Sequence, residues 1–147
     1  MNILHRWIAS LWFGGGVFLA AFAAPAAFRA ASNSTEAAEV VGAMLTRWHY
    51  LALLAPLILL VLQWRHPRGW IVIVLFFGIV FASAQALVDT RIRVMRMRSL
   101  VPISSLSPQN PLRRRFGLLH GASSLLLLAQ IVTAGIACGA PQLRAEQ

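Results

Sequence analysis

The segment RRRFGLLHGASSLLLLAQIVTAGIAC, residues 113–138, determines the kind of fold that the chain adopts. Its three arginines are followed by about 22 mostly apolar residues, the length of helix that crosses the hydrocarbon core of a bilayer. Polar side chains recur at helical spacing along one side of this helix: His120, Ser123, Gln130 and Thr133. Because an unpaired polar group in lipid is costly, this side is expected to face other helices of the protein.

The composition of the whole chain indicates a membrane protein with several spans. Its 147 residues are 59% hydrophobic and 12% charged, with a mean hydropathy of +0.71, whereas about 25% of the residues of a soluble domain are charged. The net charge of +9 comes from arginines, which gather at the ends of the apolar runs. This placement favours lipid headgroups as the partner of the charge, so we expect no nucleic-acid partner.

Four apolar runs predict four membrane-spanning helices, at about residues 4–28, 36–64, 70–98 and 113–138. Because a short connection joins antiparallel neighbours, we expect an all-α fold: an integral membrane antiparallel four-helix bundle. It forms a single domain over residues 1–147. Small residues at helical intervals, from Gly16 to Ala27 and from Gly78 to Ala86, predict close approach of other helices.

Local signals mark the ends and the bends of these helices. The segment SNSTE at 32–36 predicts a helix start, with a capping side chain followed by Glu36 in the first turn. Pro25 is expected to bend the end of the first span, and Pro56 to kink the second. Trp48 and Trp64, near opposite ends of the second span, are typical of anchors at the membrane interface.

The distribution of arginines predicts the orientation. Loops 29–35 and 99–112 with their flanks carry Arg29, Arg91, Arg93, Arg96, Arg98, Arg113, Arg114 and Arg115, whereas the other side carries Arg6, Arg65, Arg68 and Arg144. By the positive-inside rule, loops 29–35 and 99–112 are cytoplasmic and both termini are outside, in a multi-pass protein of the bacterial inner membrane.

The ionisable residues within the apolar runs fall at one depth. Arg47, Asp89 and His120 lie about 17–19 residues from the outer ends of their spans, or ~25–29 Å along the helices, and His49 lies beside them. Since Asp89 is the one acidic residue in this layer, we expect it to pair with Arg47. The predicted structural polar layer comprises Arg47, Gln85, Asp89 and Ser123.

The same layer also has the residue types of a binding site. His49 and His120, on different helices, are candidate ligands for a haem or another porphyrin-type cofactor. Paired carboxylates, a phosphate-binding glycine loop and metal-ligand spacing are missing from the sequence, so no catalytic or metal residue is predicted.

Three functions are therefore open. The first is a structural or accessory subunit that packs against other membrane proteins of a larger complex. The alternative is a protein that binds a haem, metal, pigment or small solute through Arg47, His49, Asp89 and His120. The third is an enzyme of the haem-biosynthesis type.

Four motifs resemble those of a known family: WFGG at 12–15, APAAFR at 24–29, EVVG at 39–42 and FGLLHGAS at 116–123. Over about residues 8–137 they resemble the transmembrane protein 205-like family, and the most specific is Phe-x-x-x-His-Gly-x-Ser from Phe116 to Ser123. The resemblance implies a small four-helix membrane protein, in bacteria a domain of unknown function. A more distant similarity is to four-helix copper-resistance and haem-associated membrane proteins, from which this chain departs in having few histidines within its spans.

Overall fold

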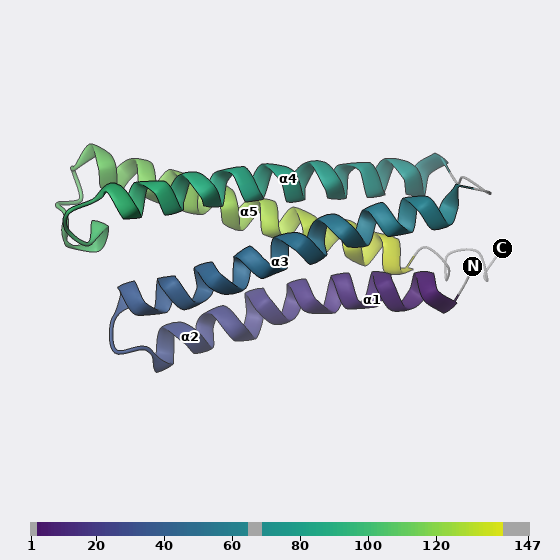
Figure 1. Cartoon of the computed structure of the whole chain (residues 1–147), viewed down its shortest axis with the longest axis horizontal. Helices are drawn as coiled ribbons and strands as arrows, with labels where there is room; N and C mark the ends of the chain where they lie inside the picture. Colours follow the sequence, from purple (N-terminus) through teal and green to yellow (C-terminus); the bar gives the residue numbers. More distant parts are fainter. Residues whose placement is uncertain (1–2, 65–68, 140–147) are drawn as a thin grey trace.

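The computed structural model describes residues 3–64 and 69–139, and the regular structure within them is entirely helical. Its elements are α1 (Ile3–Phe18), the π-helical turn η1 (Leu19–Ala23), α2 (Ala24–Ala30), α3 (Ser34–Gln63), α4 (Gly69–Arg98), the short 3-10 turn η2 (Ile103–Ser105) and α5 (Pro111–Gly139) (Figure 1). The orientation count above includes Arg65, Arg68 and Arg144, which lie outside the described residues.

Four helical stretches are long and apolar enough to cross a membrane: Ile3–Ala30, Ser34–Gln63, Gly69–Arg98 and Pro111–Gly139. Their ends differ from the predicted ones by two residues at most, so the four predicted spans are confirmed as helices of spanning length and composition. The first stretch is built from α1, η1 and α2 in succession.

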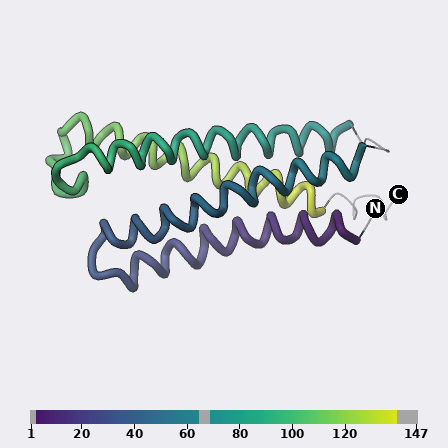
Figure 2. The backbone as a smooth tube through the Cα atoms, viewed as in Figure 1, coloured from purple at the N-terminus to yellow at the C-terminus, as the bar shows by residue number. Residues whose placement is uncertain are grey.

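The long helices lie side by side in a closed ring. α1 packs against α3 and α5, α4 packs against the same two helices, and α2 extends the contact of the first stretch with α3. Figures 1 and 2 show the chain turning back between α2 and α3 and again between α4 and α5. As a result α1 begins and α5 ends at one end of the molecule, while the turns at 31–33 and 99–110 lie at the other.

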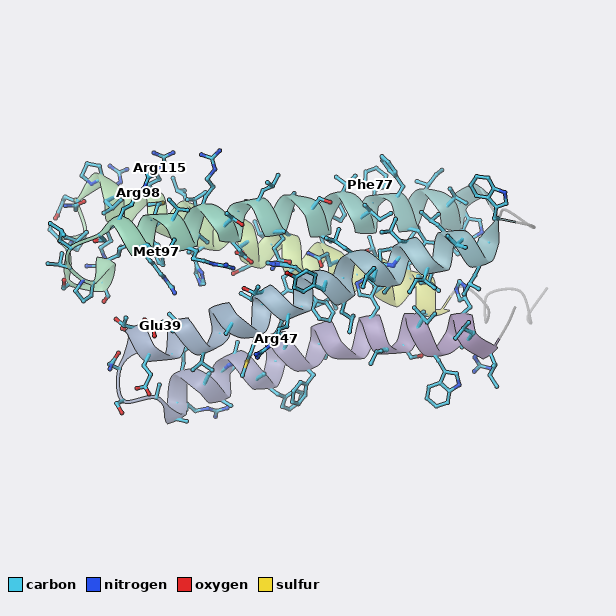
Figure 3. All side chains as sticks on the ribbon, viewed as in Figure 1. Glu39, Arg47, Phe77, Met97, Arg98 and Arg115 are labelled. Carbon is cyan, nitrogen blue, oxygen red and sulfur yellow. The ribbon has the colours of Figure 1, made fainter. Side chains whose placement is uncertain are left out.

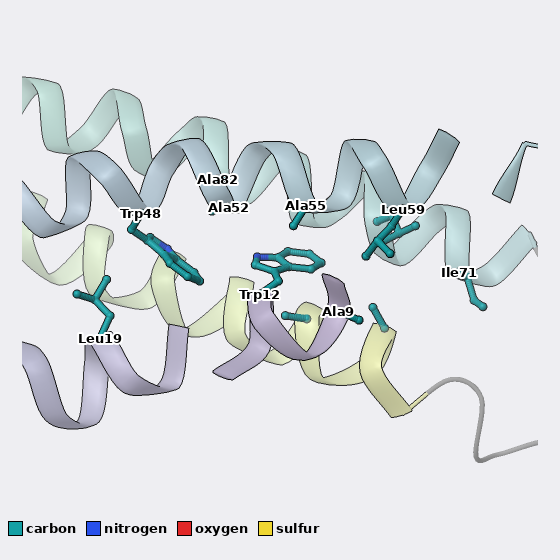
Figure 4. Close-up of a cluster of buried hydrophobic side chains, with 12 residues drawn as sticks. Ala9, Trp12, Leu19, Trp48, Ala52, Ala55, Leu59, Ile71 and Ala82 are labelled. Carbon is teal, nitrogen blue, oxygen red and sulfur yellow. The ribbon is translucent and has the colours of Figure 1, made fainter. Parts of the chain in front are cut away.

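Two tryptophans fill the centre of the ring, where glycines and alanines make room for them (Figure 4). Trp12 of α1 is fully buried, and a Cβ added at Gly78 of α4 would lie only 2.5 Å from its Cη2 atom. Trp48 of α3 lies in the same way against Gly15 and Gly16 of α1. Trp48 is therefore part of the core, and its prediction as an interface anchor is wrong, because its ring points into the bundle rather than toward its end.

The first stretch contains a change of helical register just before Pro25. The backbone N–H of Ala24 donates to the carbonyl of Leu19, five residues back, and this closes the π-turn. Such a turn accommodates the lost hydrogen bond near a proline and rotates the following residues. Leu19 is therefore buried while Ala20 is exposed, so the small residues from Gly16 to Ala27 do not form one continuous stripe.

The start of α3 has the predicted caps. The Asn33 side chain accepts hydrogen bonds from the backbone N–H groups of Thr35 and Glu36, at 3.0 and 2.9 Å. The Glu36 carboxylate in turn accepts from the N–H of Ser32, at 3.1 Å. These bonds satisfy donors that a helix start otherwise leaves free, so the helix begins sharply after residue 33. α3 then continues through Pro56 without interruption to Gln63.

Candidate functional site

Three polar side chains from three helices meet inside the bundle at Asp89. The Nε2 atom of His49 on α3 lies 3.0 Å from Oδ2 of Asp89 on α4, and both side chains are nearly nine-tenths buried. The hydroxyl of Ser123 on α5 donates to Oδ1 of Asp89 at 2.6 Å. The imidazole and carboxylate atoms are not aligned as a hydrogen bond, so the contact between them is electrostatic.

The partner of Asp89 differs from the predicted one. Arg47 is exposed, and Figure 3 shows it on the side of α3 that faces away from α4. The prediction of an Arg47–Asp89 pair is wrong. Arg47 and His49 are two positions apart, so their side chains point about 200° apart around the helix, and only one of them can face Asp89. Gln85, Asp89 and Ser123 do lie inward as the polar layer requires.

His120 lies away from this site as well. Its ring is on the exposed side of α5 and stacks on that of Phe116, with the ring centroids 6.2 Å apart and the planes at 2°. The structure therefore does not bring His49 and His120 together as a pair of axial ligands. The other members of the predicted polar side of this helix, Ser123, Gln130 and Thr133, are buried as expected.

A second polar contact lies next to the first, deeper in the bundle. The Gln130 side-chain amide on α5 donates to Oε1 of Gln85 on α4, and both side chains are fully buried. Gln85 lies one helical turn from Asp89, so the two contacts are adjacent along α4. Thr133 follows Gln130 along α5 and is satisfied by the backbone carbonyls of Ala129 and Gln130.

These residues form what we call the polar column: His49, Asp89, Ser123, Gln85, Gln130 and Thr133. It extends to the level of Gly78, where Thr133 and Trp12 lie. Asp89 and Gly78 are 11 residues apart on α4, or ~16 Å along the helix axis. The column therefore runs through about half of the hydrocarbon thickness that a spanning helix crosses.

Several buried polar atoms of the column and its neighbours have no hydrogen-bond partner among the residues that the structure describes. The donors among them are the side-chain NH2 group of Gln85 and the indole N–H groups of Trp12 and Trp48, and the acceptors are Oε1 of Gln130 and, apart from its contact with His49, Oδ2 of Asp89. An unpaired buried polar group costs ~1–3 kcal/mol, and native proteins retain such groups where water or function uses them. Buried hydrogen-bond donors and acceptors without partners thus occur close together along the polar column.

Two arginines lie between the column and the 99–110 turn, where they join α4 to its neighbours. Arg93 of α4 donates to the Thr46 hydroxyl on α3 at 2.7 Å, and Arg96 donates to the backbone carbonyl of Ala38 at 3.1 Å. The guanidinium of Arg96 also lies over the ring of Phe116, 5.2 Å from its centroid. These arginines bind α4 to α3 and α5, so they are structural rather than free charges.

Sequence reasoning placed Asp89, Gln85 and Ser123 on inward faces but missed two features. The Gln85–Gln130 contact joins two polar residues that were assigned separately, since register between helices is not visible in one chain. The buried indole of Trp48 was missed because tryptophan near a span end usually marks the interface, and no place in the core was predicted for Trp12. The glycines opposite them, Gly78 and Gly15–Gly16, were the available signal.

Comparison with known proteins supports a family but no activity. A search of curated proteins and a search of solved structures each found no significant match. A family model described as "Domain of unknown function (DUF4149)" matches residues 7–99, which is more than half of the chain. The matched part includes His49, Gln85 and Asp89 but ends before α5, and the likeness to the transmembrane protein 205-like family in particular stays a prediction. The chain belongs to the DUF4149 family of domains of unknown function.

Proposed function

We propose that this protein is an antiparallel four-helix bundle inserted in the membrane, and that it binds and releases a proton at Asp89 inside the bundle. The observation that carries this proposal is the buried His49–Asp89 contact between two apolar helices. An ionisable residue within a membrane span is expensive to keep, and in membrane proteins Asp and His so placed serve as proton relays.

The chemistry of the column supports a proton rather than a larger solute. Asp89 and His49 place a carboxylate and an imidazole in direct contact, so a proton that enters the column meets two groups that can bind it. The unpaired donors and acceptors at Gln85, Gln130 and Trp12 provide both kinds of hydrogen bond, as a chain of bound water requires. The two candidate haem ligands, His49 and His120, do not face one another, because His120 is on the exposed side of α5.

The orientation belongs to the same proposal. With loops 29–35 and 99–112 in the cytoplasm of a bacterial cell, Asp89 lies near the cytoplasmic edge of the hydrocarbon. The column then leads from this edge toward the centre of the membrane at Gly78 and Trp12. A cysteine-labelling map of the two loops in intact cells and in inverted vesicles tests this orientation.

The titration of Asp89 provides the direct test, because the chain has only this one aspartate. Protein made with ¹³C-aspartate has a single labelled carboxyl group, whose infrared band reports protonation of Asp89 alone. We expect this band to shift between the ionised and the protonated form over the pH range in which the protein stays folded, and to be absent in Asp89→Asn. A carboxyl band that stays ionised throughout that range contradicts proton binding.

Proton movement is tested in vesicles containing the purified chain and a pH-sensitive dye. Asp89→Asn is expected to lower proton uptake driven by a potassium gradient to that of empty vesicles, and His49→Gln to lower it in part. Glu39→Gln is the matched control, since it removes one negative charge from an exposed position on α3. Equal uptake by wild-type protein and Asp89→Asn contradicts transfer, while the infrared titration judges binding separately.

A role as an accessory subunit is a second candidate function, because one exposed face of α5 could pack against a helix of another membrane protein. Gly117 and Gly121 of α5 are exposed, lie one turn apart, and have open space where a Cβ would be. Two glycines at this spacing let another helix approach closely in a membrane. Substitution of both by leucine is expected to release partner proteins that co-purify in mild detergent, whereas Gly14→Leu, at a similarly open site on α1, is not.

A further inference from the structure

Arginines on α4 divide between two faces with different roles. Arg93 and Arg96 face α3, where they donate to Thr46 and to the carbonyl of Ala38. Arg91 and Arg98 are seven residues apart, which places them on one face two turns apart. That face is turned away from α3, so these two arginines are not used in binding the bundle together.

A surface pocket of about 410 Å³ lies on this second face, between the end of α4 and the start of α5. Its lining consists of three arginines and three apolar side chains: Arg91, Arg98, Arg115, Val94, Met95 and Leu119. Figure 3 shows Arg98 and Arg115 together at the same edge of the molecule. We call this the arginine pocket.

The charge of the arginine pocket is not balanced by a carboxylate of the described residues. Within residues 3–64 and 69–139 the acidic residues are Glu36, Glu39 and Asp89. Asp89 is paired with His49 inside the bundle. Glu39, near the start of α3, interacts electrostatically with Arg96, which is not part of the arginine pocket. Three arginines without a carboxylate partner among the described residues therefore line an open space that an anion can enter.

We propose that the arginine pocket binds the phosphate headgroup of an anionic phospholipid, with the upper parts of its acyl chains against Val94, Met95 and Leu119. Planar guanidinium groups suit the geometry of phosphate oxygens, and basic pockets between membrane helices on the cytoplasmic side hold anionic headgroups. The apolar half of the lining favours a lipid over free phosphate, because phosphate alone would leave those side chains without a partner.

This inference rests on the membrane insertion proposed above but is independent of proton binding at Asp89. Flotation of the protein with vesicles tests insertion alone. A protein that floats with the vesicles but shows no preference for anionic lipid overturns the inference while leaving insertion in place.

The test measures binding of dioleoylphosphatidylglycerol to the full-length protein in detergent by native mass spectrometry, with dioleoylphosphatidylcholine for comparison. We expect phosphatidylglycerol to bind more tightly, and the Arg91/Arg98/Arg115→Gln variant to bind it at least about tenfold more weakly, since each arginine near anionic lipid contributes about fivefold. The matched control is Arg29/Arg47/Arg114→Gln, which removes the same charge outside the pocket and is expected to bind as wild type.

Three results overturn the proposal: equal binding of the two lipids, equal loss in the control variant, or displacement of the lipid by millimolar inorganic phosphate. The last result would assign the pocket to free phosphate. If the triple variant does not fold, Arg115→Gln alone is measured, and a loss of about fivefold is expected. Wild-type affinity in that single variant also contradicts the proposal.

Discussion

Gly78→Ala is the substitution whose effect follows most directly from the geometry of the core. The added Cβ would lie 2.5 Å from Cη2 and 3.0 Å from Cζ2 of Trp12. Carbon atoms in contact are about 3.5–4.0 Å apart, so the overlap is about 1 Å. Trp12 is fully buried in the centre of the ring, so its indole has no free space on the opposite side. α1 and α4 must therefore move apart.

The expected cost combines two opposing terms. Overpacking a filled core costs ~1–3 kcal/mol. Replacing a helical glycine by alanine returns up to ~1 kcal/mol. The net prediction for Gly78→Ala is a loss of ~1–2 kcal/mol in the free energy of unfolding. Gly14→Ala, which adds the same methyl group to α1 where nothing lies within 4 Å, is expected to be neutral or slightly stabilising.

The assay is reversible unfolding in mixed detergent micelles, followed by tryptophan fluorescence and far-ultraviolet circular dichroism. A second variant, Trp12→Phe, shortens the ring that the new methyl group meets. In the double variant Gly78→Ala should cost less than it does alone, by ~0.5 kcal/mol or more. The reasoning is refuted if Gly78→Ala is as stable as Gly14→Ala, or if the costs of Gly78→Ala and Trp12→Phe simply add.

Three further predictions concern buried polar contacts and a helix cap. Asp89→Asn is expected to lower the melting temperature in detergent, because Ser123 loses the carboxylate that accepts its hydrogen bond and His49 loses its electrostatic partner, whereas Arg47→Met should leave it unchanged. Gln85→Leu should cost ~1–3 kcal/mol, because the Gln130 amide keeps only its 3.5 Å contact with the carbonyl of Phe81, and adding Gln130→Leu should restore most of that stability, as measured by chemical unfolding. Asn33→Ala should cost ~1 kcal/mol and speed amide hydrogen exchange in the first turn of α3.

Most of the helical framework was predictable from the sequence because the signal is strong and local. A run of about 20 apolar residues forms a helix wherever it meets lipid, since no other local structure satisfies its backbone. The ends of the four stretches were therefore placed within two residues. The cap at Asn33 was predictable for the same reason, because its bonds reach only to residues 35 and 36.

The candidate site was predictable only in part. The inward side of α5 was visible in the spacing of Ser123, Gln130 and Thr133, which one helix determines by itself. His120 was predicted to lie on the same side of α5. It is exposed instead, and its ring stacks on that of Phe116. The spacing of polar residues within a helix therefore predicts which side faces inward, but not which residues lie at the border of that side.

The sequence by itself determined that the chain forms four apolar helices with a few ionisable residues between them, because length and hydropathy need no knowledge of neighbours. Only the tertiary structure decided which residues meet: that Asp89 takes His49 rather than Arg47, and that Trp12 fills the space at Gly78. The reason is rotational. Each residue turns a helix by about 100°, so the phase of one helix against the next selects each partner, and the π-turn at Leu19–Ala23 changes that phase only for the end of the first stretch.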